Sequence, residues 1–342
     1  QSVYCGGQKI VSGRDFDKAT LNKARRKAYC SADAYCSADA LVVIDVQNCF
    51  TDGFTKTNDG TYRQVNSARD KNDIGLQNKL GNEKWKTEIV RYVEKWVNRG
   101  HNIVIFQDFH DDKHVSFING DVNEEMWNPR DCLRQRTMDA ETYGHSNNPD
   151  YREHAPKNSE FQNLKYETPV FPKHCVKGTE ESKLVDGLCE KVGGEYDGTK
   201  CIVDEKTSPN VKVVQKGTHQ LIDSFGGIYD NRLGYITELA DSQDGDLARR
   251  ASWGVLEWLN GKHVESVEAI GIADDFCVKT TVLDLADKKK AKMINANAIP
   301  LVEVNPQYTY GIVASLGQGV EAGDEALKAD LEKGGVKVRV QS

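Results

Sequence analysis

Cys277 is the residue in this chain whose type and position most suggest chemistry. It lies in residues 271–278, which join an apolar run at 264–272 to a helix-like stretch at 278–288. The first N–H groups of a helix have no internal partner and the helix dipole is positive there, so we expect a cysteine at this point to be shifted toward its nucleophilic thiolate. A small buried apolar residue is an equally good interpretation of this segment taken alone.

Charged and polar side chains follow three other segments that are typical of buried strands. The β-branched runs at 40–44, 102–106 and 211–214 would be buried on both faces of a parallel sheet. In open α/β sheets, ligands bind at the carboxyl ends of the strands. One edge of the sheet is therefore expected to carry two carboxylates, an imidazole, an ammonium group and a thiol. The residues that would meet there are Asp45, Asp108, His110, Lys216 and Cys277.

The segments between these strands predict the fold class. Residues 82–99 carry tryptophan, isoleucine and valine at helical spacing, and Gly100 follows as a stop. Further helices are predicted at 246–259 and 324–333, and short strands at 292–295 and 336–340. The simplest architecture is α/β, with a doubly wound, mainly parallel six-stranded sheet and helices on both faces.

The length of 342 residues is explained by extra segments rather than by a second domain. We predict an N-terminal extension at 1–39 and a single domain at 40–342. Within that domain, residues 121–168 and 178–209 are rich in polar residues and glycine and interrupt the strand series, so we interpret them as long surface insertions. Their size also predicts a homo-oligomer that associates through the insertions.

Charge and hydropathy argue against two classes of partner. The net charge is −7 and the basic residues are scattered, so the chain lacks the positive footprint of a nucleic-acid-binding protein. No apolar stretch approaches the roughly 20 residues that span a bilayer, so a membrane is not an expected partner. The first residues contain neither a methionine nor an apolar targeting core, which suggests a chain processed or truncated at its front.

The nine cysteines bear on the compartment. If Cys277 stays free, eight remain, and most of them lie in the polar segments, where cross-links would hold a backbone that a small core cannot. Cys189 with Cys201 is the first pair expected. This usage favours an extracellular or secretory location, and a cytoplasmic protein with unpaired thiols is the alternative. The absence of any Asn-x-Ser/Thr sequon gives secretion no support.

Several motifs together carry a family resemblance. In chain order they are residues 40–50, 108–117, 171–178, 216–217 and 271–278. They resemble the corresponding motifs of nicotinamidases of the isochorismatase-like cysteine hydrolase superfamily, and the match extends over about residues 40–302. Several independent motifs in the correct order are far more specific than any one of them.

The resemblance implies a catalytic triad of Asp45, Lys216 and Cys277. Cys277 would attack the amide carbon to give a thioester, Asp45 would carry protons and Lys216 would balance charge. The backbone N–H groups of Ala273 and Cys277 would hold the oxyanion, and the family's cis peptide bond is expected between Ile272 and Ala273. An ordinary ion pair at two strand ends is the alternative for Asp45 and Lys216.

The same resemblance implies a metal site at Asp108, His110 and His174. One carboxylate and two imidazoles suit a divalent ion, with zinc expected and iron or manganese as alternatives. In the family, the ion binds water and the pyridine nitrogen of the substrate. His114 matches a position that coordinates metal in some members, but we expect it to support the site or lie at the surface.

Two aromatic residues, Phe50 and Phe171, match positions that face the substrate ring in the family, although core packing would explain isolated phenylalanines equally well. Three residues depart from the family pattern. Phe171 stands where tryptophan is more usual, Cys49 where aspartate is usual, and Phe276 where tyrosine or histidine is common. These departures affect affinity and substrate choice rather than the triad or the metal ligands.

The function implied is hydrolysis of nicotinamide to nicotinic acid and ammonia. Within the superfamily, the alternative is hydrolysis of another amide or carbamoyl compound, because only the metal ligands argue for a pyridine ring. From another class, the alternative is a secreted structural or binding protein that has kept an enzyme core. The complete triad argues against that class.

Overall fold

The computed structural model describes more than half of the chain, including every predicted site residue. The described residues are 3–5, 8–11, 38–51, 54–56, 62–64, 82–112, 114, 116–117, 135–138, 166–169, 171, 174–218, 223–231, 254–311, 316, 318–319 and 323–339.

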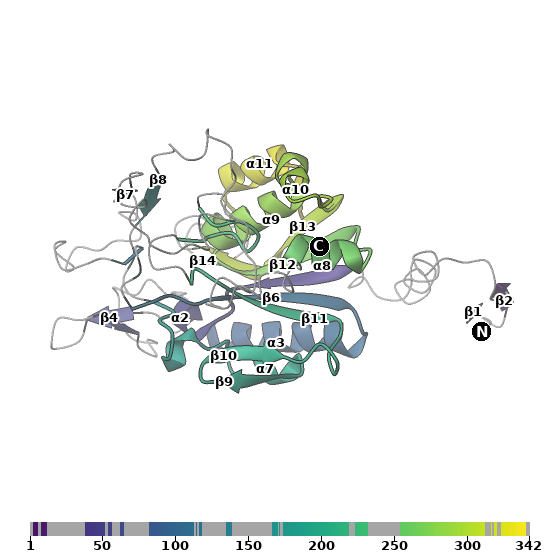
Figure 1. The fold of residues 1–342 in the computed structure, drawn as a ribbon, viewed down its shortest axis with the longest axis horizontal. Helices are drawn as coiled ribbons and strands as arrows, with labels where there is room; N and C mark the ends of the chain where they lie inside the picture. Colours follow the sequence, from purple (N-terminus) through teal and green to yellow (C-terminus); the bar gives the residue numbers. More distant parts are fainter. Residues whose placement is uncertain are drawn as a thin grey trace.

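The centre of the molecule is a seven-stranded sheet in which every pair of neighbouring strands is parallel (Figure 1). The order is β11-β6-β3-β12-β13-β14, with β15 also pairing with β13. The strands are β3 (Ala40–Ile44), β6 (Asn102–Asp108), β11 (Val211–Lys216), β12 (Ser266–Ile272), β13 (Leu301–Gly311), β14 (Gln318–Gly319) and β15 (Val336–Val338). The predicted parallel α/β sheet is therefore confirmed, and the two-residue β14 accounts for the seventh strand.

Helices cover both faces of the sheet, as predicted (Figure 1). On one face, α3 (Asn82–Asn98) packs Trp85, Ile89 and Val93 against alternate residues of β3 and β6. On the other face lie α8 (Val255–Gly261), α9 (Lys279–Ala286), α10 (Lys288–Met293) and α11 (Glu325–Lys333). Strands buried on both faces leave their carboxyl ends as the place where polar side chains can gather.

One predicted element is wrong. Residues 292–295 do not form a strand, because α10 continues to Met293 and is capped at its start by Asp287, whose carboxylate accepts the N–H groups of Lys289 and Lys290. The strand beside β12 is β13, the long segment that begins at Leu301. Of the predicted helix at 246–259, residues 246–253 lie outside the described residues, and α8 begins at Val255.

The predicted insertion at 178–209 is rich in polar residues, yet it packs against the core. It forms η3 (Glu180–Ser182), α7 (Leu188–Lys191) and a hairpin of β9 (Gly194–Asp197) with β10 (Lys200–Val203). Its apolar side chains join the core beneath α3, and the expected disulfide between Cys189 and Cys201 is present. In the insertion at 121–168, only the paired strands β7 (Gln135–Met138) and β8 (Tyr166–Pro169) are described; β8 ends one residue beyond it.

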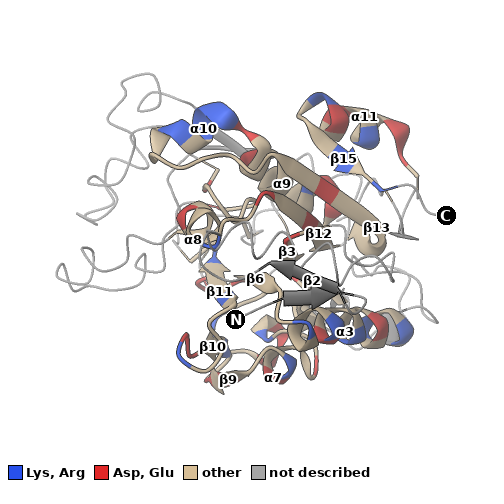
Figure 2. Ribbon diagram, turned by 90° about the vertical axis from the view of Figure 1, so that its right-hand side faces the viewer, with Lys and Arg blue, Asp and Glu red and all other residues tan. Residues whose placement is uncertain are grey.

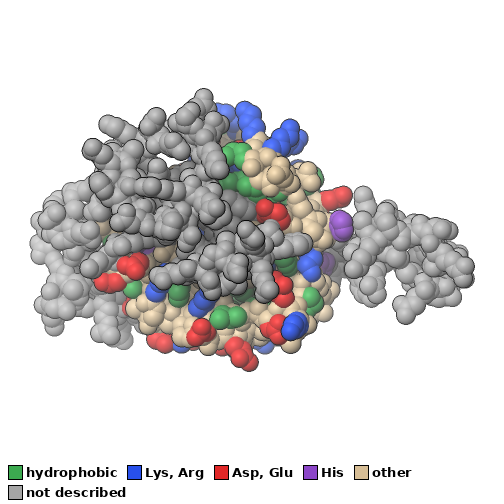
Figure 3. Space-filling view, viewed as in Figure 1, with side chains coloured by type: hydrophobic (Ala, Val, Ile, Leu, Met, Phe, Trp, Pro, Cys, Tyr) green, Lys and Arg blue, Asp and Glu red, His purple; other side chains and the backbone are tan. Residues whose placement is uncertain are grey.

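The described surface carries mixed charge. Figure 2 shows acidic and basic residues alternating along α3 and α11, with lysines concentrated on α10. Acidic and basic groups also alternate over the described part of the face in Figure 3. Among the described residues, no helix has both the length and the apolar character needed to cross a bilayer. The remaining described strands form two hairpins, β1 (Val3–Cys5) with β2 (Gln8–Val11) and β4 (Phe54–Lys56) with β5 (Tyr62–Gln64).

Strands β12 and β3 approach each other closely at Gly271. A Cβ atom there would overlap the carbonyl group of Ile44, and Gly271 has a φ of +126°. We expect Gly271→Ala to lower the free energy of unfolding by about 3 kcal/mol or more, because two strands that carry the site would have to separate. Urea denaturation would measure this loss.

Gly100→Ala is the matched control, since Gly100 also has a positive φ of +70°, but a Cβ atom added there would have no neighbour within 4 Å. Its cost should stay at about 1–2 kcal/mol, the penalty of the left-handed backbone alone. Equal losses in the two variants would contradict the predicted clash.

Candidate active site

The carboxyl ends of β3 and β11 bring Asp45 and Lys216 next to Cys277. The Lys216 Nζ atom lies 2.9 Å from Asp45 Oδ2 and 3.6 Å from Cys277 Sγ. Asp45 and Lys216 are almost completely buried and Cys277 is 8% exposed. Asp45 has a φ of +51°, a left-handed conformation that aspartate tolerates better than most residues. The three residues predicted as a triad therefore form one buried cluster.

Burial controls the protonation of this cluster. It raises the pKa of Asp45 to about 7, although the Lys216 ammonium offsets part of the rise. It also raises the pKa of the Cys277 thiol well above its usual range. Burial alone would lower the pKa of Lys216, but the negative charges of Asp108 and Asp45 raise it instead. In the resting site the ammonium is charged, the thiol is protonated and Asp45 is poised to accept a proton.

The expected shift of Cys277 toward its thiolate is wrong, because burial raises the pKa of its thiol. Cys277 lies within the single turn η4 (Asp274–Val278), and the regular helix α9 begins only at Lys279. Burial raises the pKa of the thiol more than the Lys216 ammonium lowers it, so the thiol needs a base. The peptide bond between Ile272 and Ala273 is cis, as expected from the family resemblance.

The three predicted metal ligands also meet. Asp108 is the last residue of β6, His110 follows it, and their ligand atoms lie with that of His174 within 4.8 Å of one another. Asp108 Oδ2 is 2.8 Å from His110 Nε2 and 3.6 Å from His174 Nε2. Asp108 Oδ1 lies 3.2 Å from Lys216 Nζ, so the candidate metal ligands and the triad candidates share one charge network.

The hydrogen bonding of His110 shows that this group fits a cation. His110 Nδ1 lies 2.9 Å from the carbonyl oxygen of Gly217, and a carbonyl can only accept, so Nδ1 carries a proton. In a neutral ring, Nε2 then presents a lone pair to the Asp108 carboxylate, an arrangement that needs a proton or a metal ion between them. Gly217 is required here because a Cβ atom would lie 2.5 Å from the His110 ring.

His114 lies behind the ligands rather than at the surface. It is buried, its Nδ1 lies 2.7 Å from Ser116 Oγ, and its ring stacks on that of His110 with centroids 4.0 Å apart. Asp223 is also buried near His110, and no role was assigned to it from the sequence. These contacts place His114 where it supports the His110 ring.

Phenylalanine rings lie beside the candidate metal ligand His174. Phe50 and Phe171 have centroids 5.4 and 5.8 Å from that of His174. Phe171 also contacts Phe225 and Phe276, which lie 5.7 Å from each other. Sequence reasoning assigned Phe50 and Phe171 to this wall but gave no role to Phe225, which lies in a loop without a motif signal.

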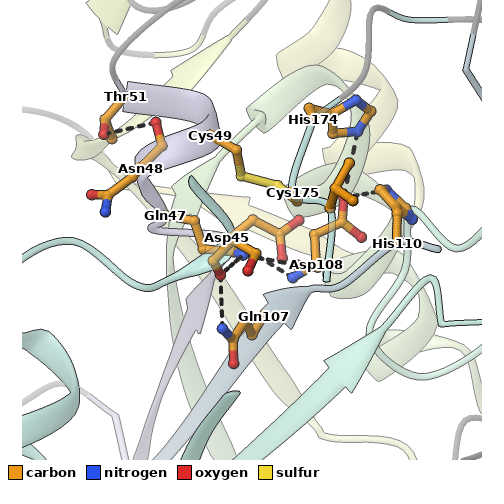
Figure 4. Close-up of a disulfide and its surroundings, with 12 residues drawn as sticks. Asp45, Gln47, Asn48, Cys49, Thr51, Gln107, Asp108, His110, His174 and Cys175 are labelled. Atoms are coloured by element: carbon orange, nitrogen blue, oxygen red, sulfur yellow. Dashed lines mark hydrogen bonds and ion pairs between the residues drawn. A yellow bond between two sulfur atoms is a disulfide. The ribbon is translucent and has the colours of Figure 1, made fainter. Parts of the chain in front are cut away.

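Two further residues that sequence reasoning missed hold the site in place. The side chain of Gln47 donates to the carbonyl oxygen of Asp108 at 2.8 Å and accepts the N–H of Asp108 at 2.6 Å (Figure 4). These two hydrogen bonds fix the backbone of the candidate metal ligand Asp108. The carbonyl oxygen of Ser224 accepts a hydrogen bond from Lys216 Nζ at 2.9 Å. The spacing of Gln47 from Asp45 was the sequence signal available for Gln47. Ser224 acts through its backbone, so no side-chain pattern could have indicated it.

Comparison with known proteins gives distant but consistent relatives. No protein-family model matches the chain. It is 23% identical over 220 residues to the nicotinamidase of Acinetobacter baylyi. The aligned region covers 64% of this chain and 72% of that protein. It is 22% identical over 187 residues to the nicotinamidase of Saccharomyces cerevisiae, covering 55% of this chain and 62% of that protein.

A solved structure agrees with these sequence relatives. The yeast nicotinamidase superposes with a TM-score of 0.50 at 19% identity, over 87% of this chain and 98% of that chain. At this identity the likeness establishes the fold. The chain is thus a distant sequence relative of curated nicotinamidases and has the isochorismatase-like hydrolase fold.

Proposed function

We propose that the protein is an amidohydrolase that converts nicotinamide to nicotinic acid and ammonia. The observation that carries the proposal is the buried cluster of Asp45, Lys216 and Cys277, joined through Lys216 to Asp108 of the metal group. A nucleophile, a base and a ring-selecting group lie within one network. The similarity to curated nicotinamidases supports the same substrate.

In the first half of the reaction, Asp45 removes the proton from the Cys277 thiol, and the sulfur attacks the amide carbon. Asp45 suits this role because its raised pKa of about 7 makes it a stronger base than an ordinary carboxylate. The tetrahedral oxyanion is held by the N–H groups of Ala273 and Cys277. Asp45 then gives its proton to the leaving amine, ammonia departs and a thioester remains.

In the second half, Asp45 takes a proton from water, whose oxygen attacks the thioester carbon. The carbon–sulfur bond breaks, and the Cys277 thiolate recovers its proton from Asp45 while the acid leaves. Lys216 stays charged throughout and stabilises whichever of its neighbours, Asp45 or Cys277, is negative.

The metal would be held by Asp108, His110 and His174. A divalent ion there supplies a Lewis acid for the pyridine nitrogen and so selects and orients the ring, with zinc as the proposed ion. The rings of Phe50 and Phe171 would pack against the flat faces of the substrate.

Removal of the metal should stop turnover of nicotinamide. After chelation, ammonia release is expected to fall by at least about a hundredfold, because the pyridine ring loses its anchor, and to return when zinc is added back. Release would be followed with a coupled ammonia assay. Benzamide, which lacks the ring nitrogen, should be a poor substrate with or without zinc, and an unchanged rate after verified metal removal would contradict the assigned metal role.

The pH dependence should follow Asp45. Below its pKa of about 7 the carboxyl group is protonated and cannot accept the thiol proton, so kcat/KM should fall about tenfold per pH unit on the acid side. The negative charge of Asp108 is one cause of the raised pKa, so a bound divalent ion should move this limb to lower pH. A kcat/KM that stays constant down to the ordinary carboxyl pKa of about 4 would rule out this assignment.

The first experiment is ammonia release from nicotinamide by the purified, metal-loaded protein. Release supports the nicotinamidase proposal. Hydrolysis of other amides or carbamoyl compounds but not of nicotinamide would support the alternative hydrolase, and no hydrolysis of any would support a binding protein. We also propose an oxidising compartment, supported by the two disulfides among the described residues.

A further inference from the structure

We propose that the disulfide between Cys49 and Cys175 is a positioning element of the metal and substrate site. It would hold His174 in place to bind the ion and Phe50 in place to face the substrate ring. The part that concerns the substrate rests on the proposed function, whereas the part that concerns metal binding does not.

The bond lies inside the site. Cys49 is in the short helix α2 (Asn48–Thr51), and Cys175 follows the candidate ligand His174 (Figure 4). The two cysteines are 126 residues apart in the chain, and both are completely buried. Because Phe50 adjoins one half of the bond and His174 the other, the cross-link ties the aromatic wall to the metal group.

A second contact makes the connection between these segments rigid. The ring of Phe50 lies 5.4 Å from that of His174, so α2 holds residues 174–175 at two adjacent points. A single contact would still allow the segment to pivot. Two contacts, one of them covalent, restrict both the position and the orientation of the His174 ring.

Cys175 also connects the two histidine ligands. Its carbonyl oxygen accepts the N–H of His110 at 3.0 Å, and the N–H of Lys177 donates to the carbonyl oxygen of His110 at 2.8 Å. Cys175 has a φ of +48°, a left-handed conformation that is unfavourable for a non-glycine residue and persists only where the surroundings impose it. Releasing the bond to Cys49 removes one of those surroundings.

Residue 49 departs from the pattern that the family resemblance implies. Aspartate is expected there, whereas this chain has the cysteine that forms the cross-link. The cysteine takes the place of a carboxylate and forms a covalent bond to Cys175, the residue next to the candidate metal ligand His174. A site that depends on the bond would bind its ion fully only when the protein is oxidised.

The other disulfide provides a matched comparison. Cys189 and Cys201 are equally buried, but they are only 12 residues apart and join α7 to β10, two elements that carry no predicted site residue. Loss of either bond should lower the melting temperature, because each one restricts the unfolded chain. Only loss of the bond at Cys49 should change the ligand geometry.

The test compares the double variants Cys49→Ala/Cys175→Ala and Cys189→Ala/Cys201→Ala with the parent protein, without reductant. Zinc affinity is measured by competition with a chromophoric chelator, at a temperature where circular dichroism shows each protein folded. We expect the first variant to bind zinc about 10–100-fold more weakly and the second to match the parent within about twofold. Parent-like zinc affinity in the folded first variant would overturn the proposal.

Nicotinamide hydrolysis is measured separately on the same proteins. If the parent does not hydrolyse nicotinamide, the proposed function fails, and the zinc result alone decides the positioning role. If the parent does hydrolyse it, kcat/KM should fall in the first variant and not in the second. If the first variant does not fold, Cys49→Asp replaces it, since it breaks the bond with the family's usual residue; parent-like zinc affinity in that variant would also overturn the proposal.

Discussion

Cys277→Ala is expected to lower kcat/KM for nicotinamide by more than about 10⁴-fold, because no other described side chain can form the thioester. The Sγ atom lies 3.6 Å from Lys216 and, like Asp45, at the edge of the sheet where the strands end. Removing it takes away the attacking atom and leaves the base and the ammonium in place. The loss would be measured by ammonia release at saturating zinc.

Cys277→Ser separates nucleophilicity from geometry. The hydroxyl occupies nearly the same space but is a far weaker acid than a thiol, so a carboxylate with a pKa of about 7 cannot activate it efficiently. The serine variant should therefore lose nearly as much activity as the alanine variant. Zinc content should remain that of the parent in both, because Cys277 is not among the metal-ligand candidates.

Activity in Cys277→Ala within about tenfold of the parent would show that the reaction does not use this thiol. The thioester itself can be detected by quenching the parent protein with acid during turnover. Mass spectrometry should then find a nicotinoyl group on the peptide that contains Cys277 and on no other peptide.

The parts of this site that were predictable from the sequence are those whose side chains follow regular strands. Asp45, Asp108 and Lys216 each end a run of β-branched residues, and parallel pairing places the ends of neighbouring strands together. The parallel direction of the strands therefore predicts where these three side chains meet, whatever the conformation of the loops. The family resemblance added His174 and the cis bond, which no periodicity reveals.

The parts that were not predictable depend on contacts between distant segments. Gln47 hydrogen-bonds to the backbone of Asp108, and the carbonyl oxygen of Ser224 accepts a hydrogen bond from Lys216. Cys49 is bonded to Cys175, which lies 126 residues away in the chain. A backbone acceptor has no residue signature, and nine cysteines allow many pairings. The strand expected at 292–295 is absent for a local reason: Asp287 caps the start of a short helix that continues to Met293.

Lys216→Met is expected to combine a loss of stability with a change in pH dependence. Among the described residues, Lys216 is the cation that lies between Asp45 and Asp108, at 2.9 and 3.2 Å from their carboxylate oxygens. Without it, the buried Asp45 carboxylate loses its cation and faces the negative charge of Asp108, so the free energy of unfolding at neutral pH should fall by about 3–5 kcal/mol. Urea denaturation would measure this change.

Lys279→Met is the control for the loss of a lysine. Lys279 pairs with Asp330 at the surface, where solvent screens the charges, so its removal should cost no more than about 1 kcal/mol. Similar losses in the two variants would show that burial of the Lys216 network adds nothing to its stabilising effect.

The pH profile distinguishes a catalytic role of Lys216 from a purely structural one. The Lys216 charge lowers the pKa of Asp45, so its removal should raise that pKa above the parent value of about 7 and move the acid limb of kcat/KM to higher pH. An unmoved limb in the remaining folded enzyme would show that the charge of Lys216 does not control the protonation of the catalytic base. The direction of the shift therefore tests whether Lys216 keeps Asp45 able to accept the Cys277 proton at neutral pH.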